Sequence, residues 1–118
     1  MEKPCFRFRR CERLKGREQI KRVFAQGRSV TCSGAKLFLM RNGLPENRIV
    51  FTFARKYGNA VTRNRSRRLS REAFRFTSSG LSPGHDLVLL VYPGKDAFAA
   101  RVRQLHILFS KAGLFEND

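Results

Sequence analysis

Six arginines fall within thirteen residues of this 118-residue chain, and their side chains could bind phosphate groups. A guanidinium donates hydrogen bonds in a planar fork that matches two phosphate oxygens, and it remains charged at physiological pH. The run contains no Gly or Pro, so it predicts a helix that presents several guanidiniums together. The six residues are Arg63, Arg65, Arg67, Arg68, Arg71 and Arg75.

The two sides of this predicted helix differ in character when its residues are placed at intervals of about 100°. The side that is small or apolar, and could pack on a sheet, carries Thr62, Ser66, Leu69, Ser70, Ala73, Phe74 and Thr77. The other side carries Asn64 and the arginines, with Arg63 near the boundary and Glu72 as its acidic residue. We therefore expect this second side to face a polyanion.

Whole-chain composition also indicates a polyanionic partner. The chain has 25 Lys and Arg residues against 9 Asp and Glu residues, a formal net charge of +16 that is typical of nucleic-acid-binding proteins. Its 42% hydrophobic content, with eleven Phe, excludes a wholly disordered basic tail. We expect a single domain over residues 1–118 that binds a nucleic acid, in which residues 1–13 form a basic arm.

Several classes of protein share this composition. A ribosomal or general RNA-binding protein would have the same size and charge, whereas a DNA-binding module is less favoured because no helix-turn-helix or zinc signature is present. The three cysteines lack the paired spacing of a zinc site and are expected to be reduced thiols. No apolar run approaches the roughly 20 residues of a membrane span, and no signal peptide is recognisable, so we expect a soluble, cytoplasmic protein.

Helices are predicted at both ends of the chain as well as in the arginine-rich run. A first helix over residues 16–26, ended by Gly27, follows from the helical spacing of Ile20, Val23 and Phe24. A last amphipathic helix runs to about residue 112, and Asp96 is expected to be its N-cap.

Four segments have the character of strands, namely residues 29–31, 36–41, 48–54 and 85–92. The apolar residues of the third segment run without strict alternation, which predicts a central strand. The element order predicts an α+β fold, a small two-layer α/β sandwich with about four strands, helices on one face and a βαβ crossover through the arginine-rich helix. The expected core phenylalanines are Phe51, Phe53, Phe74, Phe98 and Phe109.

The segment from Phe53 to Phe74 resembles the signature of the bacterial ribonuclease P protein subunit. That family shows a basic pair, a Gly-Asn-Ala turn and an Arg-Asn-Arg helix ending in Arg-x-x-Phe. This chain has them at Arg55-Lys56, Gly58-Asn59-Ala60, Arg63-Asn64-Arg65 and Arg71 to Phe74. The resemblance extends over nearly the whole chain, through Arg13-Leu14, Val23-Phe24, Gly27 and Phe38.

In that family the protein is the auxiliary subunit of an RNA-based endoribonuclease that removes the 5′ leader from precursor tRNA. The resemblance implies a ribosomal protein S5 domain 2-like fold, a monomeric protein and two RNA partners, ribonuclease P RNA and precursor tRNA. It also implies that the active site and its Mg²⁺ belong to the RNA subunit, and that the protein alone binds no cofactor.

Transfer of the family pattern, residue by residue, implies two surfaces. The surface for the catalytic RNA comprises Arg55, Lys56, Arg63, Asn64, Arg65, Arg67, Arg68 and Arg71. In the family the single-stranded leader lies in a cleft. The residues of this chain that match the cleft are Arg13, Ile20, Phe24 and Phe38. Aromatic rings can stack splayed bases without reading their sequence. Spacing alone leaves Phe24 and Phe38 as candidates for the core as well.

This chain departs from the family pattern at three places. Ile20 stands where many members carry a second aromatic residue, and it packs well but stacks poorly. Ser66 and Ser70 stand on the buried side of the helix where larger apolar residues are usual, and Val50-Phe51 replaces a Val-Gly-Leu-like pattern in a strand. We expect Phe51 to fill the volume that the two serines leave in the core.

The sequence offers no recognisable active site within the protein itself. His85 and His106 are isolated, and no carboxylate pair, Ser-His-Asp or Cys-His pattern stands out. Acidic residues are scarce in the basic part of the chain, so a protein-bound Mg²⁺ is not expected. We expect neither catalytic residues nor metal ligands in the protein.

Overall fold

The computed structural model describes residues 16–94 and 96–115, which form three helices and four strands. In chain order these are α1 (Arg17–Gln26), β1 (Arg28–Cys32), β2 (Ala35–Arg41), β3 (Arg48–Phe53), α2 (Ala60–Thr77), β4 (His85–Val91) and α3 (Phe98–Lys111). Every predicted helix and strand is present, with small shifts in its bounds. The predicted basic arm, which includes Arg13, lies outside the described residues.

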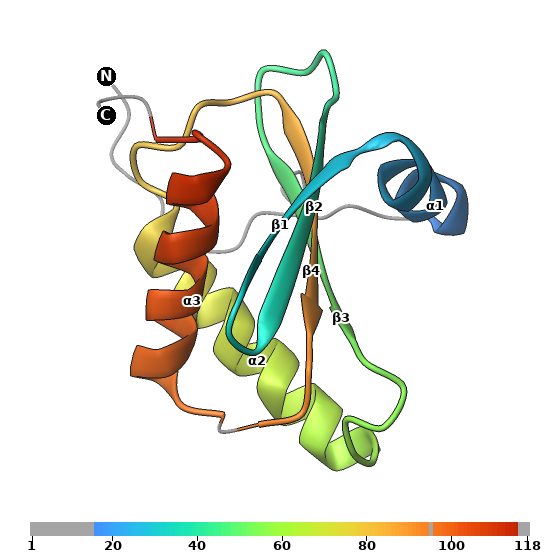
Figure 1. The fold of residues 1–118 in the computed structure, drawn as a ribbon, viewed down its shortest axis with the longest axis vertical. Helices are drawn as coiled ribbons and strands as arrows, with labels where there is room; N and C mark the ends of the chain where they lie inside the picture. The colour runs from blue at the N-terminus through green and yellow to red at the C-terminus, as the bar shows by residue number, and fades with distance from the viewer. Residues whose placement is uncertain (1–15, 95, 116–118) are drawn as a thin grey trace.

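The four strands form one mixed sheet in the order β1-β2-β4-β3. β2 pairs antiparallel with β1 and β4, whereas β3 and β4 are parallel and are joined by α2 in the predicted βαβ crossover (Figure 1). The prediction that the 48–54 strand is central is wrong, because β3 lies at the edge and β4 is interior. β3 is apolar without alternation because Ile49 and Phe51 enter the main core while Val50 packs on the opposite face.

A bidentate ion pair holds β3 beside β4 at the start of both strands. Arg48 Nε and Nη2 donate to the two carboxylate oxygens of Asp86, each at 2.8 Å, and Asn42 Nδ2 donates to the same carboxylate at 2.9 Å. The hydrogen bond to Asp86 raises the pKa of Arg48 above its ordinary value. Because Asp86 is buried, its charge requires these partners, and a shift in strand register would remove them.

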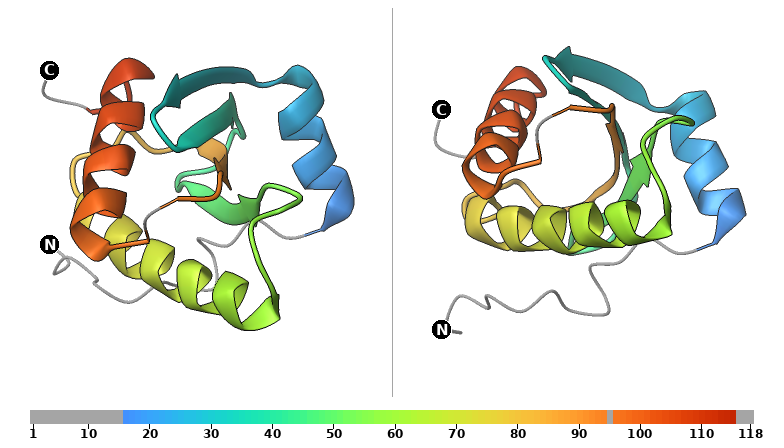
Figure 2. Two further views of the ribbon diagram at one scale, coloured as in Figure 1. Left: turned by 60° about the horizontal axis from the view of Figure 1, so that its bottom comes forward. Right: turned by 90° about the horizontal axis from the view of Figure 1, so that it is seen from below.

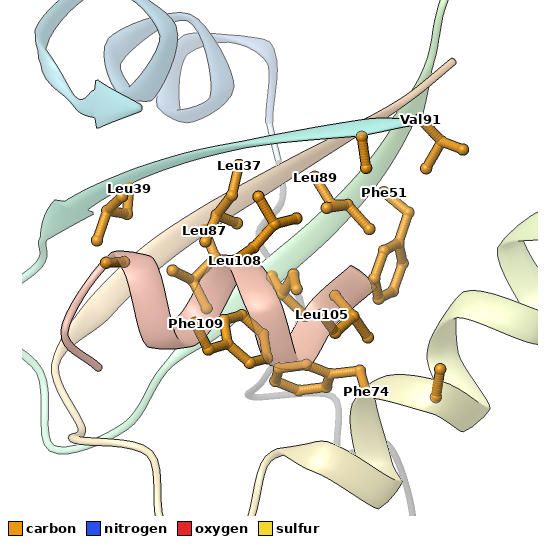
Figure 3. Close-up of a cluster of buried hydrophobic side chains, with 14 of the residues drawn as sticks. Leu37, Leu39, Phe51, Phe74, Leu87, Leu89, Val91, Leu105, Leu108 and Phe109 are labelled. Atoms are coloured by element: carbon orange, nitrogen blue, oxygen red, sulfur yellow. The ribbon is translucent and has the colours of Figure 1, made fainter. Parts of the chain in front are cut away.

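The main core lies between the sheet and the helices α2 and α3 (Figure 2). Alternate strand residues point into it and meet Phe74 from α2 and Phe109 from α3 (Figure 3). The Phe74 ring makes edge-on contacts with Phe51 and Phe109, at centroid distances of 6.4 and 6.2 Å. Burial of each such ring stabilises the fold by about 1.5–3 kcal/mol.

Helix α1 lies on the opposite face of the sheet from α3 (Figures 1 and 2). Its buried Val23 packs against Val88 of β4 in a second, smaller core. Gly27 ends α1 as predicted, and a Cβ at this position would lie 2.5 Å from Val23 O and 2.6 Å from Leu39 O. The predicted placement of helices on one face therefore holds for α2 and α3, and α1 covers part of the other face.

Two predictions at the start of α3 are wrong. Phe98, which was assigned to the core, is 41% exposed because it begins the helix, where its ring meets the exposed ring of Phe76 at 5.9 Å. Asp96 does not cap α3: the N-cap is Ala97, and no side chain caps the helix. Asp96 instead forms an ion pair with Arg101, a charged partner that a backbone N–H cannot match.

Asn59 caps the N-terminus of α2. Its side-chain oxygen accepts a hydrogen bond from Thr62 N at 2.9 Å, which satisfies one of the N–H groups that a helix end leaves unpaired. The first turn of α2 contains no acidic residue, so no carboxylate there adds to the cap.

We predict that Asn59→Ala lowers the free energy of unfolding by about 1 kcal/mol, because it removes the cap acceptor. Chemical denaturation followed by circular dichroism would measure the change. Asn59→Asp keeps an acceptor and places a negative charge at the helix N-terminus, so it should retain the original stability. Equal losses in both variants would contradict the capping role.

Candidate nucleic-acid interface

The predicted RNA-binding residues lie on α2 and on the turn before it. We call this set the arginine surface: Arg55, Lys56, Arg63, Asn64, Arg65, Arg67, Arg68 and Arg71. The inner side of α2 is held in the core by the buried residues Ser66, Ser70, Ala73 and Phe74. The guanidiniums are therefore left on the outer and lateral sides of the helix, where a partner can reach them.

The arginine surface wraps around α2 and is not one flat face. Arg65 and Arg67 lie about 100° to either side of the buried Ser66. Arg63, Arg67 and Arg71 recur every four residues and form a ridge on the β3 side of the helix, whereas Arg65 lies on the opposite flank. A partner that contacts both flanks must therefore enclose part of the helix.

Arg63 connects the first turn of α2 to the basic turn, which we define as residues 55–59. Its Nη2 donates to the carbonyl oxygen of Arg55 at 3.1 Å. A Cβ at Gly58 would lie 3.1 Å from the side chain of Thr62, so the turn approaches the helix closely. Exposed Arg55 and Lys56 consequently stand beside the N-terminus of an 18-residue helix, whose partial positive charge also favours phosphate.

Arg67 is held by its neighbours, whereas Arg65 and Arg68 are exposed. The Arg67 guanidinium lies 5.2 Å from the centroid of the Phe53 ring, and its Nη1 donates to Asn64 Oδ1 at 3.0 Å. A cation–π contact of this kind contributes about 0.5–1 kcal/mol at an exposed site. Asn64 of the Arg-Asn-Arg motif thus orients an arginine one turn further along the helix.

The aromatic residues of the predicted leader cleft lie on the α1 face of the sheet. Phe24 and Phe38 meet edge to face with centroids 4.7 Å apart, and Phe24 is 40% exposed. The Lys36 ammonium lies 5.1 Å from the centroid of the Phe38 ring. Ile20 is half-buried and packs against the small core of Val23 and Val88, as its apolar side chain allows. Phe38 is partly buried against the same small core, whereas Phe24 is more exposed, so the pair lies between core and surface beside a positive charge.

A buried polar network that sequence analysis missed lies beneath the arginine surface. Arg101 of α3 is 2% exposed; its Nη2 forms an ion pair with Asp96, and its Nη1 donates to Ser66 at 3.4 Å and to Ser70. The Tyr57 hydroxyl donates to Asp96 Oδ2 at 2.6 Å and lies 2.8 Å from Ser66 Oγ. Burial, together with the hydrogen bond to Asp96, raises the pKa of Tyr57 above its ordinary value.

This network explains the two serines of α2 differently from the prediction. Phe51 packs against Phe74 in the main core, while the serine hydroxyls serve as hydrogen-bond partners of Arg101. Apolar residues at these positions would leave a buried guanidinium short of partners, which is strongly destabilising. Two hydroxyl residues spaced i, i+4 on a buried helix side were the available signal, but their partner is 31 to 35 residues away in the sequence.

The described residues contain no group of three or more His, Cys, Asp or Glu that could hold a metal ion. His85 lies at the start of β4, and burial lowers its pKa, with the cations Arg41 and Arg28 acting in the same direction. Within the described part of the chain, no helix has the length and apolar character needed to cross a bilayer. The groups that the fold brings together are cations, donors and aromatic rings, which can bind and orient a phosphate backbone and its bases.

Comparison with known proteins identifies this combination of fold and motif. The family model described as Ribonuclease P matches residues 8–113. The chain belongs to the ribonuclease P protein family. Both the family and the α+β fold that the sequence predicted are thereby confirmed.

Individual members of the ribonuclease P protein family match over most of their length. The ribonuclease P protein component of Caldanaerobacter subterraneus subsp. tengcongensis is 36% identical over 107 residues, which cover 88% of this chain and 91% of that protein. The component of Dictyoglomus thermophilum is 33% identical over 117 residues, which cover 96% of this chain and 98% of that protein. The solved RNase P protein from Thermotoga maritima superposes with a TM-score of 0.71 at 27% identity, over 82% of this chain and 94% of that chain.

Proposed function

We propose that this protein is the protein subunit of ribonuclease P, which binds the catalytic RNA and the 5′ leader of precursor tRNA and so assists removal of the leader. The observation that carries the proposal is the family match over residues 8–113, a region that includes the whole arginine surface. In this holoenzyme the RNA subunit carries the Mg²⁺-dependent active site. The protein contributes binding and orientation, enters the complex as a monomer and contains no catalytic residue.

We assign the arginine surface to the catalytic RNA. Arg63 and Arg67 are held by contacts to the basic turn and to Phe53, so they present their charge in a set direction. Arg65 and Arg68 are exposed neighbours at i, i+3 on the side of α2 away from the Arg63, Arg67 and Arg71 ridge, where they can adapt to a phosphate backbone. Each phosphate that a guanidinium neutralises releases condensed counterions, which makes the affinity strongly dependent on salt.

We assign the Phe24 and Phe38 pair to the leader of precursor tRNA. A base stacked on an exposed ring is bound without regard to its identity, as leaders of differing sequence require. Lys36, beside the Phe38 ring, supplies a cation for the adjoining phosphate. Because the inner side of α2 packs in the main core, whereas Phe24 and Phe38 lie beside the smaller core on the α1 face of the sheet, the two surfaces are separate and can be occupied at the same time.

Reconstitution tests the proposal against the alternative of a general RNA-binding protein. Addition of the protein to ribonuclease P RNA at low Mg²⁺ should restore cleavage of precursor tRNA at the mature 5′ end, because the protein's charge replaces part of the cation requirement. The RNA-free protein should cleave nothing. Absence of stimulation, or correct cleavage by the protein alone, would refute the assignment.

The double variant Arg65→Ala/Arg68→Ala should bind the catalytic RNA about 10-fold or more weakly, because charged hydrogen bonds are each worth about 1.5–3 kcal/mol. The slope of log affinity against log salt should fall by about 1 per lost phosphate contact. Filter binding over a salt series measures both quantities. Arg41→Ala/Arg103→Ala removes the same charge from exposed sites outside α2, and equal weakening by this control would contradict a defined surface.

Phe38→Leu should reduce affinity for precursor tRNA by about five-fold or more, because one stacked base contributes about 1–3 kcal/mol. Affinity for mature tRNA and assembly with the RNA subunit should stay unchanged. Phe38→Tyr keeps the aromatic ring and should retain the preference for the precursor. Collapse of assembly in Phe38→Leu would show that the residue serves the core and not the leader.

A further inference from the structure

The basic turn is anchored to the protein interior by one side chain. Tyr57 lies between the exposed cations Arg55 and Lys56 and the helix cap Asn59, yet it is only 8% exposed. Its ring packs against Phe53 at a centroid distance of 4.8 Å, and its backbone N–H donates to Ala54 O at 3.0 Å. The turn is therefore fixed at its centre, while the cations on it remain accessible.

The Tyr57 hydroxyl connects the turn to α2 and to the segment that precedes α3. It donates to Asp96 in the segment before α3, at 2.6 Å, and lies 2.8 Å from Ser66 in α2. Asp96 is in turn held by its ion pair with the buried Arg101, whose Nε donates to Gln104 at 2.9 Å. Asp96, although acidic, is neutralised inside this network and does not oppose a phosphate at the turn.

We propose that Tyr57 is a positioning residue that, together with Asp96 and Arg101, preorganises the basic turn for the catalytic RNA. This inference rests on the proposed function, because it concerns how the arginine surface is held. A surface turn with long cationic side chains normally loses conformational freedom when it binds, and that loss weakens binding. The hydroxyl of Tyr57 imposes the order during folding, so Arg55 and Lys56 meet the RNA from a backbone that is already set.

The same contacts explain why the network consists of polar groups. A phenylalanine at position 57 could fill the same space against Phe53, but it could not bond to Asp96 or Ser66. Hydrogen bonds are directional, so they specify the position of the turn along α2 more narrowly than apolar packing does. The ion pair of Asp96 with Arg101 supplies a fixed acceptor for that directional bond.

The test is a double-mutant cycle in RNA binding, measured well below the unfolding temperature with a ribonuclease P RNA transcript. Tyr57→Phe keeps the ring and removes only the hydroxyl, and we expect it to weaken binding by about two- to ten-fold. Combined with Arg55→Ala/Lys56→Ala, it should cause almost no further loss, because the cations that it positions are already absent. Combined with Arg65→Ala/Arg68→Ala, its effect should be fully additive.

Two controls separate positioning from general destabilisation. Tyr92→Phe removes a hydroxyl from the exposed second tyrosine and should leave RNA affinity unchanged. Thermal unfolding of each variant establishes that the protein is folded at the assay temperature. A structural defect alone would weaken binding equally in both combined variants, whereas positioning affects only the combination that retains Arg55 and Lys56.

The outcomes distinguish this inference from the proposed function. No effect of Tyr57→Phe, or full additivity with Arg55→Ala/Lys56→Ala, would overturn the positioning role while leaving the arginine surface intact. If Arg55→Ala/Lys56→Ala itself leaves RNA affinity unchanged, the basic turn does not bind RNA and the inference is refuted. If the α2 variant is also without effect, the proposed RNA-binding surface is refuted.

Discussion

Burial of the inner side of α2 is the constraint on which the rest of the structure depends. Phe74 fills the core between the sheet and α3, and the neighbouring small residues allow the helices to approach closely. Because α2 joins the adjacent parallel strands β3 and β4, both of its ends are tied to the sheet. With the inner side committed to the core, the arginines can only lie outward, so the fold itself creates the charged surface.

Two ion pairs, each with one buried member, make this packing specific. Arg48 with Asp86 sets the register of β3 beside β4, and Arg101 with Asp96 sets α3 and its preceding segment against α2. A buried charge without its partner costs far more than a misplaced methyl group, so each pair penalises alternative arrangements strongly. The first pair thereby holds the strand that precedes the arginine surface, and the second holds the helix that carries it.

Periodicity and motif predicted the parts of the protein that depend on neighbouring residues. The amphipathic helix α2 and the Gly27 helix end follow from local spacing, the family follows from the motif between Phe53 and Phe74, and all three are confirmed. The wrong predictions concern placement. A continuous apolar run such as that of β3 arises at a sheet edge when a helix covers each face, and Phe98 is apolar by type but begins its helix beyond the core. No local pattern distinguishes an edge strand from a central one, or an exposed Phe from a buried one, because burial depends on which distant element packs against the residue.

The sequence by itself determined the charge, the amphipathic division of α2 and the Arg-Asn-Arg motif, because these are properties of residue type and of spacing within one or two helical turns. Only the tertiary structure decided that Asp96 pairs with Arg101 and does not cap α3. It also decided that Ser66, Ser70 and Tyr57 form hydrogen bonds with this ion pair. Their contacts join residues up to 39 positions apart. Such contacts form only after the sheet and α3 bring these elements together, since the hydrogen bonds act over about 3 Å and the spacing of Ser66 and Ser70 does not indicate their distant partner.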